Sequence, residues 1–167
     1  MSTAVTLYML VGIPCVGKST WLEDRVIHSD QVLSTDNIIE QTAASSGATY
    51  SESFKDLIKI AERKMYTQLE WLSTGSAADT GITEIYWDQT NLTKTTRAKK
   101  LAKLPVDWKK IAVFFDHRGF EDVIFERNKH RPGKIIPENV LNSMMNNLQV
   151  PSVTEGFDEV MFPVLGW

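Results

Sequence analysis

Five short apolar runs alternate along the chain with longer stretches of helical periodicity. The runs cover residues 6–11, 31–34, 82–87, 110–115 and 159–164, and each has the length of a buried strand. Strands that alternate with helices are typical of βαβ units. The pattern therefore predicts an α/β fold, in which a central parallel sheet carries helices on both faces.

Helical periodicity is strongest between the second and third runs, where apolar residues recur three and four positions apart. We expect this stripe to pack in the core: Phe54, Leu57, Ile58, Ala61, Met65, Leu69 and Leu72. Shorter helices are expected at 20–26, at 120–126, in a basic stretch that Pro105 ends, and after Pro137. No linker or repeat divides the chain, so we expect a single domain over residues 1–167.

Composition narrows the class of protein. The single cysteine, Cys15, excludes an internal disulfide framework and a zinc site built from several cysteines. The first apolar stretch, residues 4–11, has no Lys or Arg before it and leads into a glycine-rich loop, so we interpret it as a strand and not a signal sequence. We therefore expect a cytoplasmic protein without membrane association, and a homo-oligomer stays open.

Charge is unevenly distributed along the chain. The net charge is −3, yet residues 94–134 hold twelve Lys/Arg against five Asp/Glu, which gives this region +7. Such asymmetry favours a surface that faces polyanions. A solvated, lysine-rich helix face after Asn91 explains it equally well.

A phosphate-binding signature, G-x-x-x-x-G-K-[ST], joins the first strand to the next helix. It comprises Gly12, Ile13, Pro14, Cys15, Val16, Gly17, Lys18 and Ser19, and Thr20 follows in the helix. Glycines let the backbone approach phosphate, and successive N–H groups surround it at the helix N-terminus. We expect this phosphate loop (residues 12–19) to hold ATP, with Lys18 between the β- and γ-phosphates and Ser19 on Mg²⁺.

Polar residues also follow the second and third strands, whose carboxyl ends face the ligand in an open α/β sheet. Asp36 is a candidate for accepting a hydroxyl proton, and its alternative role is that of a helix N-cap. After the third strand, Asp88 is placed to support Mg²⁺ through water, Gln89 belongs to the same block, and Thr90 and Asn91 are candidates for binding an acceptor phosphate. A turn that leads to a helix capped by Thr93 is the alternative.

The basic segment (residues 127–134) carries Arg127 and Arg131 four positions apart, followed by Pro-Gly. We predict a short basic lid, in which these two arginines neutralise charge on the donor phosphates. A solvated basic turn is the competing interpretation.

With these blocks in order, the chain resembles the kinase domain of the T-even bacteriophage polynucleotide kinases over about residues 5–150. The similarity lies in GIPCVGKSTW (Gly12 to Trp21), Asp36, Thr90-Asn91-Leu92, RNKHRPGKIIP (Arg127 to Pro137), Val140-Leu141 and Ser143-Met144. The resemblance implies an adenylate-kinase-like fold and transfer of the ATP γ-phosphate to the 5′-hydroxyl of DNA or RNA ends.

Carried over by position, the resemblance implies that Lys18 and Ser19 serve ATP·Mg²⁺ and that Asp36 is the general base. Thr90 would contact the acceptor's phosphate, and Arg127 would bind the donor's phosphates. The catalytic set is therefore Lys18, Asp36 and Arg127.

The chain departs from that family at three points. Ile39 stands where the family has an acceptor-binding Arg, and Gln89 replaces the Asp before the Thr, with Asp88 one position earlier. A D-x-D-G-T block is absent, so we expect no 3′-phosphatase activity. Two alternatives stay open: a small-molecule, nucleoside or nucleotide kinase of the same superfamily, and a non-enzymatic, nucleotide-dependent module that binds nucleic acid.

Overall fold

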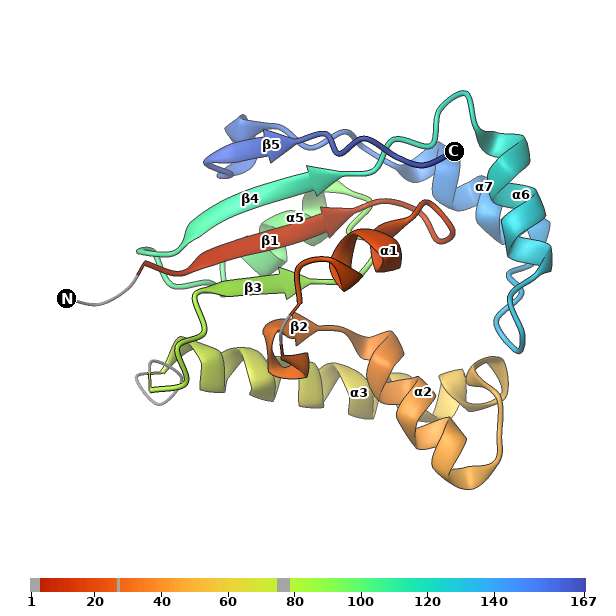
Figure 1. Cartoon of the computed structure of the whole chain (residues 1–167), viewed down its shortest axis with the longest axis horizontal. Helices are drawn as coiled ribbons and strands as arrows, with labels where there is room; N and C mark the ends of the chain where they lie inside the picture. Colours follow the sequence, from red (N-terminus) through yellow and green to blue (C-terminus); the bar gives the residue numbers. More distant parts are fainter. Residues whose placement is uncertain (1–3, 27, 75–78) are drawn as a thin grey trace.

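The computed structural model describes residues 4–26, 28–74 and 79–167, and it contains one parallel sheet (Figure 1). The strands lie in the order β2-β3-β1-β4-β5. Thr6 of β1 lies opposite Glu84 of β3 and Lys109 of β4, so the three central strands start level with one another. Their bounds are Thr6–Val11 (β1), Val32–Leu33 (β2), Glu84–Trp87 (β3), Lys109–Phe114 (β4) and Glu159–Met161 (β5). The predicted parallel α/β sheet is confirmed.

Helices cover both faces of this sheet, as the apolar patterns predict. One core cluster joins the strands to α3 (Tyr50–Ser73) and α5 (Lys94–Leu101), through residues such as Met65 and Leu101. The other joins them to α1 (Lys18–Glu23), α6 (Glu121–Lys129) and α7 (Glu138–Asn147). In the described part of the chain, no helix is long and apolar enough to cross a membrane.

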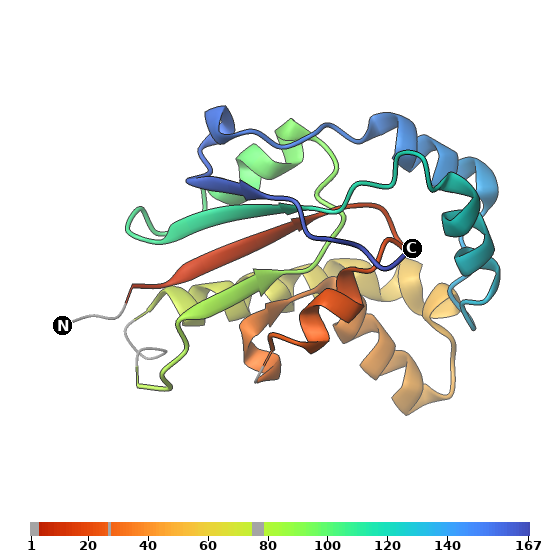
Figure 2. The ribbon, with the colours of Figure 1, turned by 45° about the horizontal axis from the view of Figure 1, so that its top comes forward.

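Two regions project past the carboxyl edge of the sheet and face each other in Figure 1. One consists of α2 (Thr35–Ser46) and the first half of α3, and the other consists of α6, α7 and the turn between them. Figure 2 shows that the end of the chain also reaches this edge, beside the loop that follows β1. The short 3-10 helices Ser29–Gln31 and Val153–Glu155 precede β2 and β5.

Several predicted boundaries shift. The last apolar run forms a strand only as far as Met161, and the residues after it run on as irregular chain. Helix α1 begins at Lys18 and ends at Glu23, earlier at both ends than expected. Helix α6 extends to Lys129, so Arg127 lies in its last turn and not in a loop. The prediction that Phe54 packs in the core is wrong, because the start of α3 overhangs the sheet and leaves this side chain 39% exposed.

Candidate functional site

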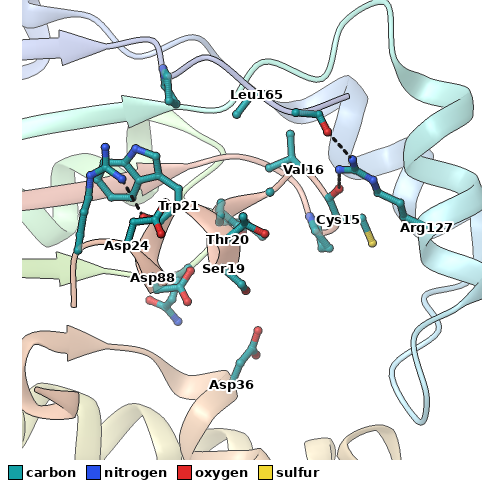
Figure 3. Close-up of a pocket in the computed structure, with 18 of the residues that line it drawn as sticks. Cys15, Val16, Ser19, Thr20, Trp21, Asp24, Asp36, Asp88, Arg127 and Leu165 are labelled. Atoms are coloured by element: carbon teal, nitrogen blue, oxygen red, sulfur yellow. Dashed lines mark hydrogen bonds between the residues drawn. The ribbon is translucent and has the colours of Figure 1, made fainter. Parts of the chain in front are cut away.

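An open pocket of about 790 Å³ lies at the carboxyl edge of the sheet. Its lining combines the phosphate loop with side chains that follow β2 and β3, with the basic segment and with the C-terminal stretch. Figure 3 shows Ser19, Asp36 and Asp88 around one space, with Arg127 on the far side of the loop. Polar groups from four distant parts of the sequence thus meet in one place, and Asp36, Asp88, Thr90, Arg127 and Arg131 are among them.

The phosphate loop has the backbone shape of an anion-binding site. Cys15 (φ 69°) and Gly17 (φ 104°) both adopt left-handed conformations, which turn successive N–H groups toward one side. A Cβ on Gly12 would lie 3.0 Å from Cβ of Phe115, so the start of the loop is pressed against the chain that follows β4. Helix α1 has neither an acidic residue in its first turn nor a side-chain cap. Its N-terminus therefore has no built-in anion, which suits a phosphate ligand.

Lys18 folds back over this loop, and its Nζ donates to the carbonyl oxygen of Gly12 at 2.7 Å. Burial lowers the pKa of Lys18, while the carboxylates of Asp88 and Asp36 raise it and the charge of Arg131 lowers it further. The amino group therefore lies between the acidic and basic walls of the pocket. Ile13, by contrast, is fully buried and contributes its side chain to the core.

Oxygen atoms suited to a hard cation lie beside Lys18. The exposed hydroxyl of Ser19 and the carboxylate of Asp88 point into the same space (Figure 3). Burial raises the pKa of Asp88, against the charge of Lys18, and the nearby carboxylate of Asp36 raises it too. Among the described residues, no group of three or more His, Cys, Asp or Glu side chains gathers to hold a metal alone. A hydroxyl and one carboxylate fit Mg²⁺ that is shared with phosphates.

Asp36 does not cap a helix. The N-cap of α2 is Ser34, whose Oγ accepts from the N–H of Asn37. The cap interpretation of Asp36 is therefore wrong, because this residue lies within the first turn and projects into the pocket. Its Oδ1 accepts a hydrogen bond from the hydroxyl of Tyr50 at 2.6 Å. The carboxylate is thus exposed to the pocket and held by a neighbour that sequence reasoning did not identify.

Of the three residues Gln89, Thr90 and Asn91 that follow Asp88, Thr90 faces the pocket, and the side chains of the other two are bonded within the protein. Thr90 lines the pocket, and its carbonyl oxygen accepts from the N–H of Gly12 at 3.0 Å. Asn91 is only 2% exposed and donates to the carbonyl oxygen of Leu10, so its predicted contact with an acceptor is wrong. Gln89 borders the pocket, but its carboxamide is bonded to the protein on both sides. Thr93 caps α5, as expected.

Arg127 reaches from α6 to the phosphate loop. Its guanidinium donates to the carbonyl oxygens of Cys15 at 3.1 Å and Gly166 at 3.0 Å, and lies 5.0 Å from the ring centre of Trp167. Arg131 also lines the pocket, and its Nη1 is buried without a hydrogen-bond partner in the described structure. An unpartnered donor of this kind is suited to an anionic ligand.

The rest of the basic segment contacts the opposite wall. The carbonyl oxygen of Gly133 accepts from the N–H and the Oγ of Ser51, at 3.1 and 2.7 Å. Lys134 forms an ion pair with Glu40, and its Nζ lies 4.7 Å from the ring centre of Tyr50. The segment therefore bridges the pocket, from α6 to α2 and α3.

Comparison of the sequence with known families identifies the family of this chain. A family model described as an AAA domain matches residues 7–151. The chain belongs to the AAA domain family. No curated protein sequence matches it. In structure, this AAA domain is similar to a crystal structure named "putative kinase" from Chloroflexus aurantiacus J-10-fl, with a TM-score of 0.62 and 18% sequence identity. The similarity covers 98% of this chain and 86% of the other, and it shows that the two share a fold.

Several lining residues of the AAA domain could not be identified from its sequence. Trp21, Asp24 and Arg25 follow the phosphate loop, and Glu40 lies one turn beyond Asp36. Residues 163–166 also line the pocket, although residues 163 and 164 belong to the run that predicts a strand. The one signal in the sequence that could have identified Trp21, Asp24 and Arg25 is that they closely follow the phosphate loop. The other contacts depend on how the chain returns to this edge.

The structure also divides the basic region of the AAA domain. Within residues 94–134, only Arg127, Arg131 and Lys134 line the pocket. The exposed lysines of α5 and the start of β4 lie elsewhere. The +7 charge is therefore split between the pocket and a separate solvated surface.

Proposed function

We propose that the protein transfers the γ-phosphoryl group of ATP to the 5′-hydroxyl of a DNA or RNA end. The observation that carries this proposal is the convergence in one pocket of a phosphate loop, an exposed carboxylate and two arginines: Lys18, Asp36, Arg127 and Arg131. The P-loop kinase-like fold supports phosphoryl transfer. The ordered resemblance to the polynucleotide kinases supports the choice of acceptor.

On the donor side, the amides of the phosphate loop and the amino group of Lys18 would bind the β- and γ-phosphates. Ser19, with Asp88 acting through water, would hold Mg²⁺, which would neutralise charge on the phosphate oxygens. Arg127 would turn from the carbonyl oxygen of Cys15 toward the oxygens of the leaving group. The buried Nη1 of Arg131 would gain the partner it lacks.

On the acceptor side, the hydroxyl oxygen attacks the γ-phosphorus while the bond between that phosphorus and the β,γ-bridging oxygen breaks. The carboxylate of Asp36 takes the hydroxyl proton, and ADP leaves with the bonding electrons. Tyr50 holds one oxygen of that carboxylate and leaves the other for the proton. Thr90 is the residue that would contact the phosphate of the acceptor strand.

A second candidate is a kinase for a small neutral or cationic alcohol. Ile39 is fully buried, so no cation at that position faces the acceptor. Glu40 already pairs with Lys134, and three carboxylates (Asp36, Glu40 and Asp88) line this wall. A wall with three carboxylates and no arginine at position 39 binds a polyanion less favourably than the corresponding wall of the polynucleotide kinases.

The test is a transfer assay with γ-labelled ATP·Mg²⁺ and a panel of acceptors: 5′-hydroxyl DNA, 5′-hydroxyl RNA, 3′-nucleotides and nucleosides, with 5′-phosphorylated strands as the matched control. We expect label on the 5′-hydroxyl strands and on 3′-nucleotides, which carry the same 5′-hydroxyl and neighbouring phosphate, but not on nucleosides, and none with Lys18→Ala. Label only on nucleosides or other small alcohols would favour the second candidate. Binding of ATP and strands with no transfer to any acceptor would contradict both and favour a non-enzymatic module.

A further inference from the structure

Lys100 is a buried lysine that forms no ion pair within the part of the chain that the structure describes. Its side chain comes from α5 and is 7% exposed, and its Nζ lies 5.1 Å from the ring centre of Trp87. Among the described residues, no carboxylate lies within ion-pair distance of it. Burying an amino group is costly unless it is well hydrogen-bonded. Its partners are the carboxamide oxygens of Gln89, at 2.7 Å, and Asn91.

These bonds determine how the side chain of Gln89 is oriented. Its Oε1 accepts from Lys100 and also from Nε1 of Trp87, at 3.0 Å. The carboxamide nitrogen must therefore point the other way, where it donates to Oγ1 of Thr35 at 3.0 Å. Thr35 is the buried first residue of α2, and Asp36 follows it directly. A chain of hydrogen bonds thus runs from Lys100 to the residue before the candidate base.

The second partner of Lys100 ties the same block to the phosphate loop. Oδ1 of Asn91 accepts from Lys100, while its Nδ2 donates to the carbonyl oxygen of Leu10 at 2.8 Å. Between Gln89 and Asn91, the carbonyl oxygen of Thr90 receives the N–H of Gly12. One amino group therefore contacts both side chains that flank Thr90.

We propose that Lys100 is a positioning residue for phosphoryl transfer, which fixes Thr90 through Gln89 and Asn91, and Asp36 through Gln89 and Thr35. An apolar side chain would fill the same space but would leave the Asn91 oxygen unpartnered. The amino group donates to both oxygens whether or not it carries its third proton. The effect on turnover rests on the proposed function, whereas the effect on the geometry of the block does not.

The experiment compares Lys100→Met with Lys99→Met, an exposed neighbour on the same helix. We expect Lys100→Met to lower the acceptor kcat/KM by about tenfold or more, with the KM for ATP unchanged and Lys99→Met like wild type. Gln89→Leu should cause a similar loss, and the double variant should lose little more than either single one. Gln89→Glu keeps the acceptor for Trp87 and Lys100. Its second oxygen can accept from the Thr35 hydroxyl, which then donates instead of accepting, so this variant should retain activity.

Amide hydrogen exchange supplies a readout that does not depend on activity. The amides of Gly12 and Asp88 are bonded to the carbonyl oxygens of Thr90 and Leu33, so both should exchange faster in Lys100→Met and not in Lys99→Met. Unchanged exchange and acceptor kcat/KM within twofold would overturn the proposal, as would a change in ATP binding alone. If Lys100→Met does not fold, Gln89→Leu against Gln89→Glu tests the same link. Wild-type protein that transfers to no acceptor contradicts the proposed function, while exchange still tests Lys100.

Discussion

Asp36 combines an exposed position in the pocket with a hydrogen bond that orients it. Because Ser34 caps α2, Asp36→Asn removes the proton acceptor without removing a cap. We expect its melting temperature to stay near wild type while kcat falls by about 10² to 10⁴. Ser34→Ala is the matched control and should lower stability by about 1 kcal/mol. Rapid transfer by the Asn variant would make Asp88 the next candidate.

Arg127 is the second residue whose role can be separated by kinetics. Charge builds on the leaving oxygens only as the bond breaks, so Arg127→Ala should lower kcat, by up to roughly 10³-fold, more than it raises the KM for ATP. Arg118→Ala removes an exposed arginine outside the pocket and should have no effect. If Arg127→Ala changes only the acceptor KM, this residue belongs to the acceptor site.

At the scale of elements, the turn between α6 and α7 meets α3 through Gly133. This residue has φ +67°, and a Cβ on it would lie 2.9 Å from Cβ of Thr49. Gly133→Ala should therefore separate the turn from α3, speed hydrogen exchange at the Ser51 amide and lower kcat/KM. Gly47→Ala has similar backbone strain at φ +76° but nothing within 4 Å, so it isolates the contact. Equal effects of the two variants would exclude a role for the contact.

The helices, strands and loops that position the candidate site could be predicted wherever the local sequence determines their structure. The apolar run before Gly12 and the signature that follows it place a strand, a loop and a helix without further information. The hydrogen bond from Tyr50 to Asp36 and the one from Arg127 to Gly166 join residues 14 and 39 positions apart. Apolar periodicity predicts which face of an element is buried, and it contains no information on such polar contacts. The extent of β5 was overestimated for a related reason, since Pro163 and Val164, at the end of the predicted run, line the pocket instead of pairing.

At the scale of the whole molecule, the strand order brings the proposed donor and acceptor groups together. β1 lies between β3 and β4. The phosphate loop that follows β1 therefore has Asp88, Gln89 and Thr90, the residues after β3, on one side. The basic segment and the C-terminal stretch approach from the other. The predicted single domain is consistent with this arrangement and stays a prediction, as does the cytoplasmic location, and a homo-oligomer stays open.

Buried charge makes the stability of the molecule depend on pH. Burial lowers the pKa of Lys100 from 10.5 to about 7, the charge of Lys18 lowers it too, and Glu62 raises it. Between these values the unfolded chain binds a proton that the folded chain does not. The free energy of unfolding of the wild type should therefore rise relative to Lys100→Met by up to about 1.4 kcal/mol per pH unit from pH 7 to 10.

Urea unfolding of the wild type, Lys100→Met and Lys99→Met at pH 6, 7, 8 and 9 measures this difference. Below pH 7 the folded wild type contains a buried cation, which is unfavourable. The free energy of unfolding of Lys100→Met relative to the wild type should therefore be highest there. Groups that do not interact with Lys100 titrate alike in all three proteins, and their contributions cancel. A difference between Lys100→Met and wild type that stays constant with pH would mean that the amino group keeps its proton throughout.

The sole cysteine of the chain lies in the phosphate loop, half-buried at the pocket wall. Burial raises the pKa of its thiol, while the charges of Arg131, Arg127 and Lys18 lower it. A maleimide or a fluorescent thiol reagent thus attaches at one place only, without any engineered substitution. Because Cys15 borders the pocket, we expect a ligand seated on the loop to slow that labelling and a ligand bound elsewhere to leave its rate unchanged. The same native handle lets occupancy be followed in solution for every variant that retains Cys15.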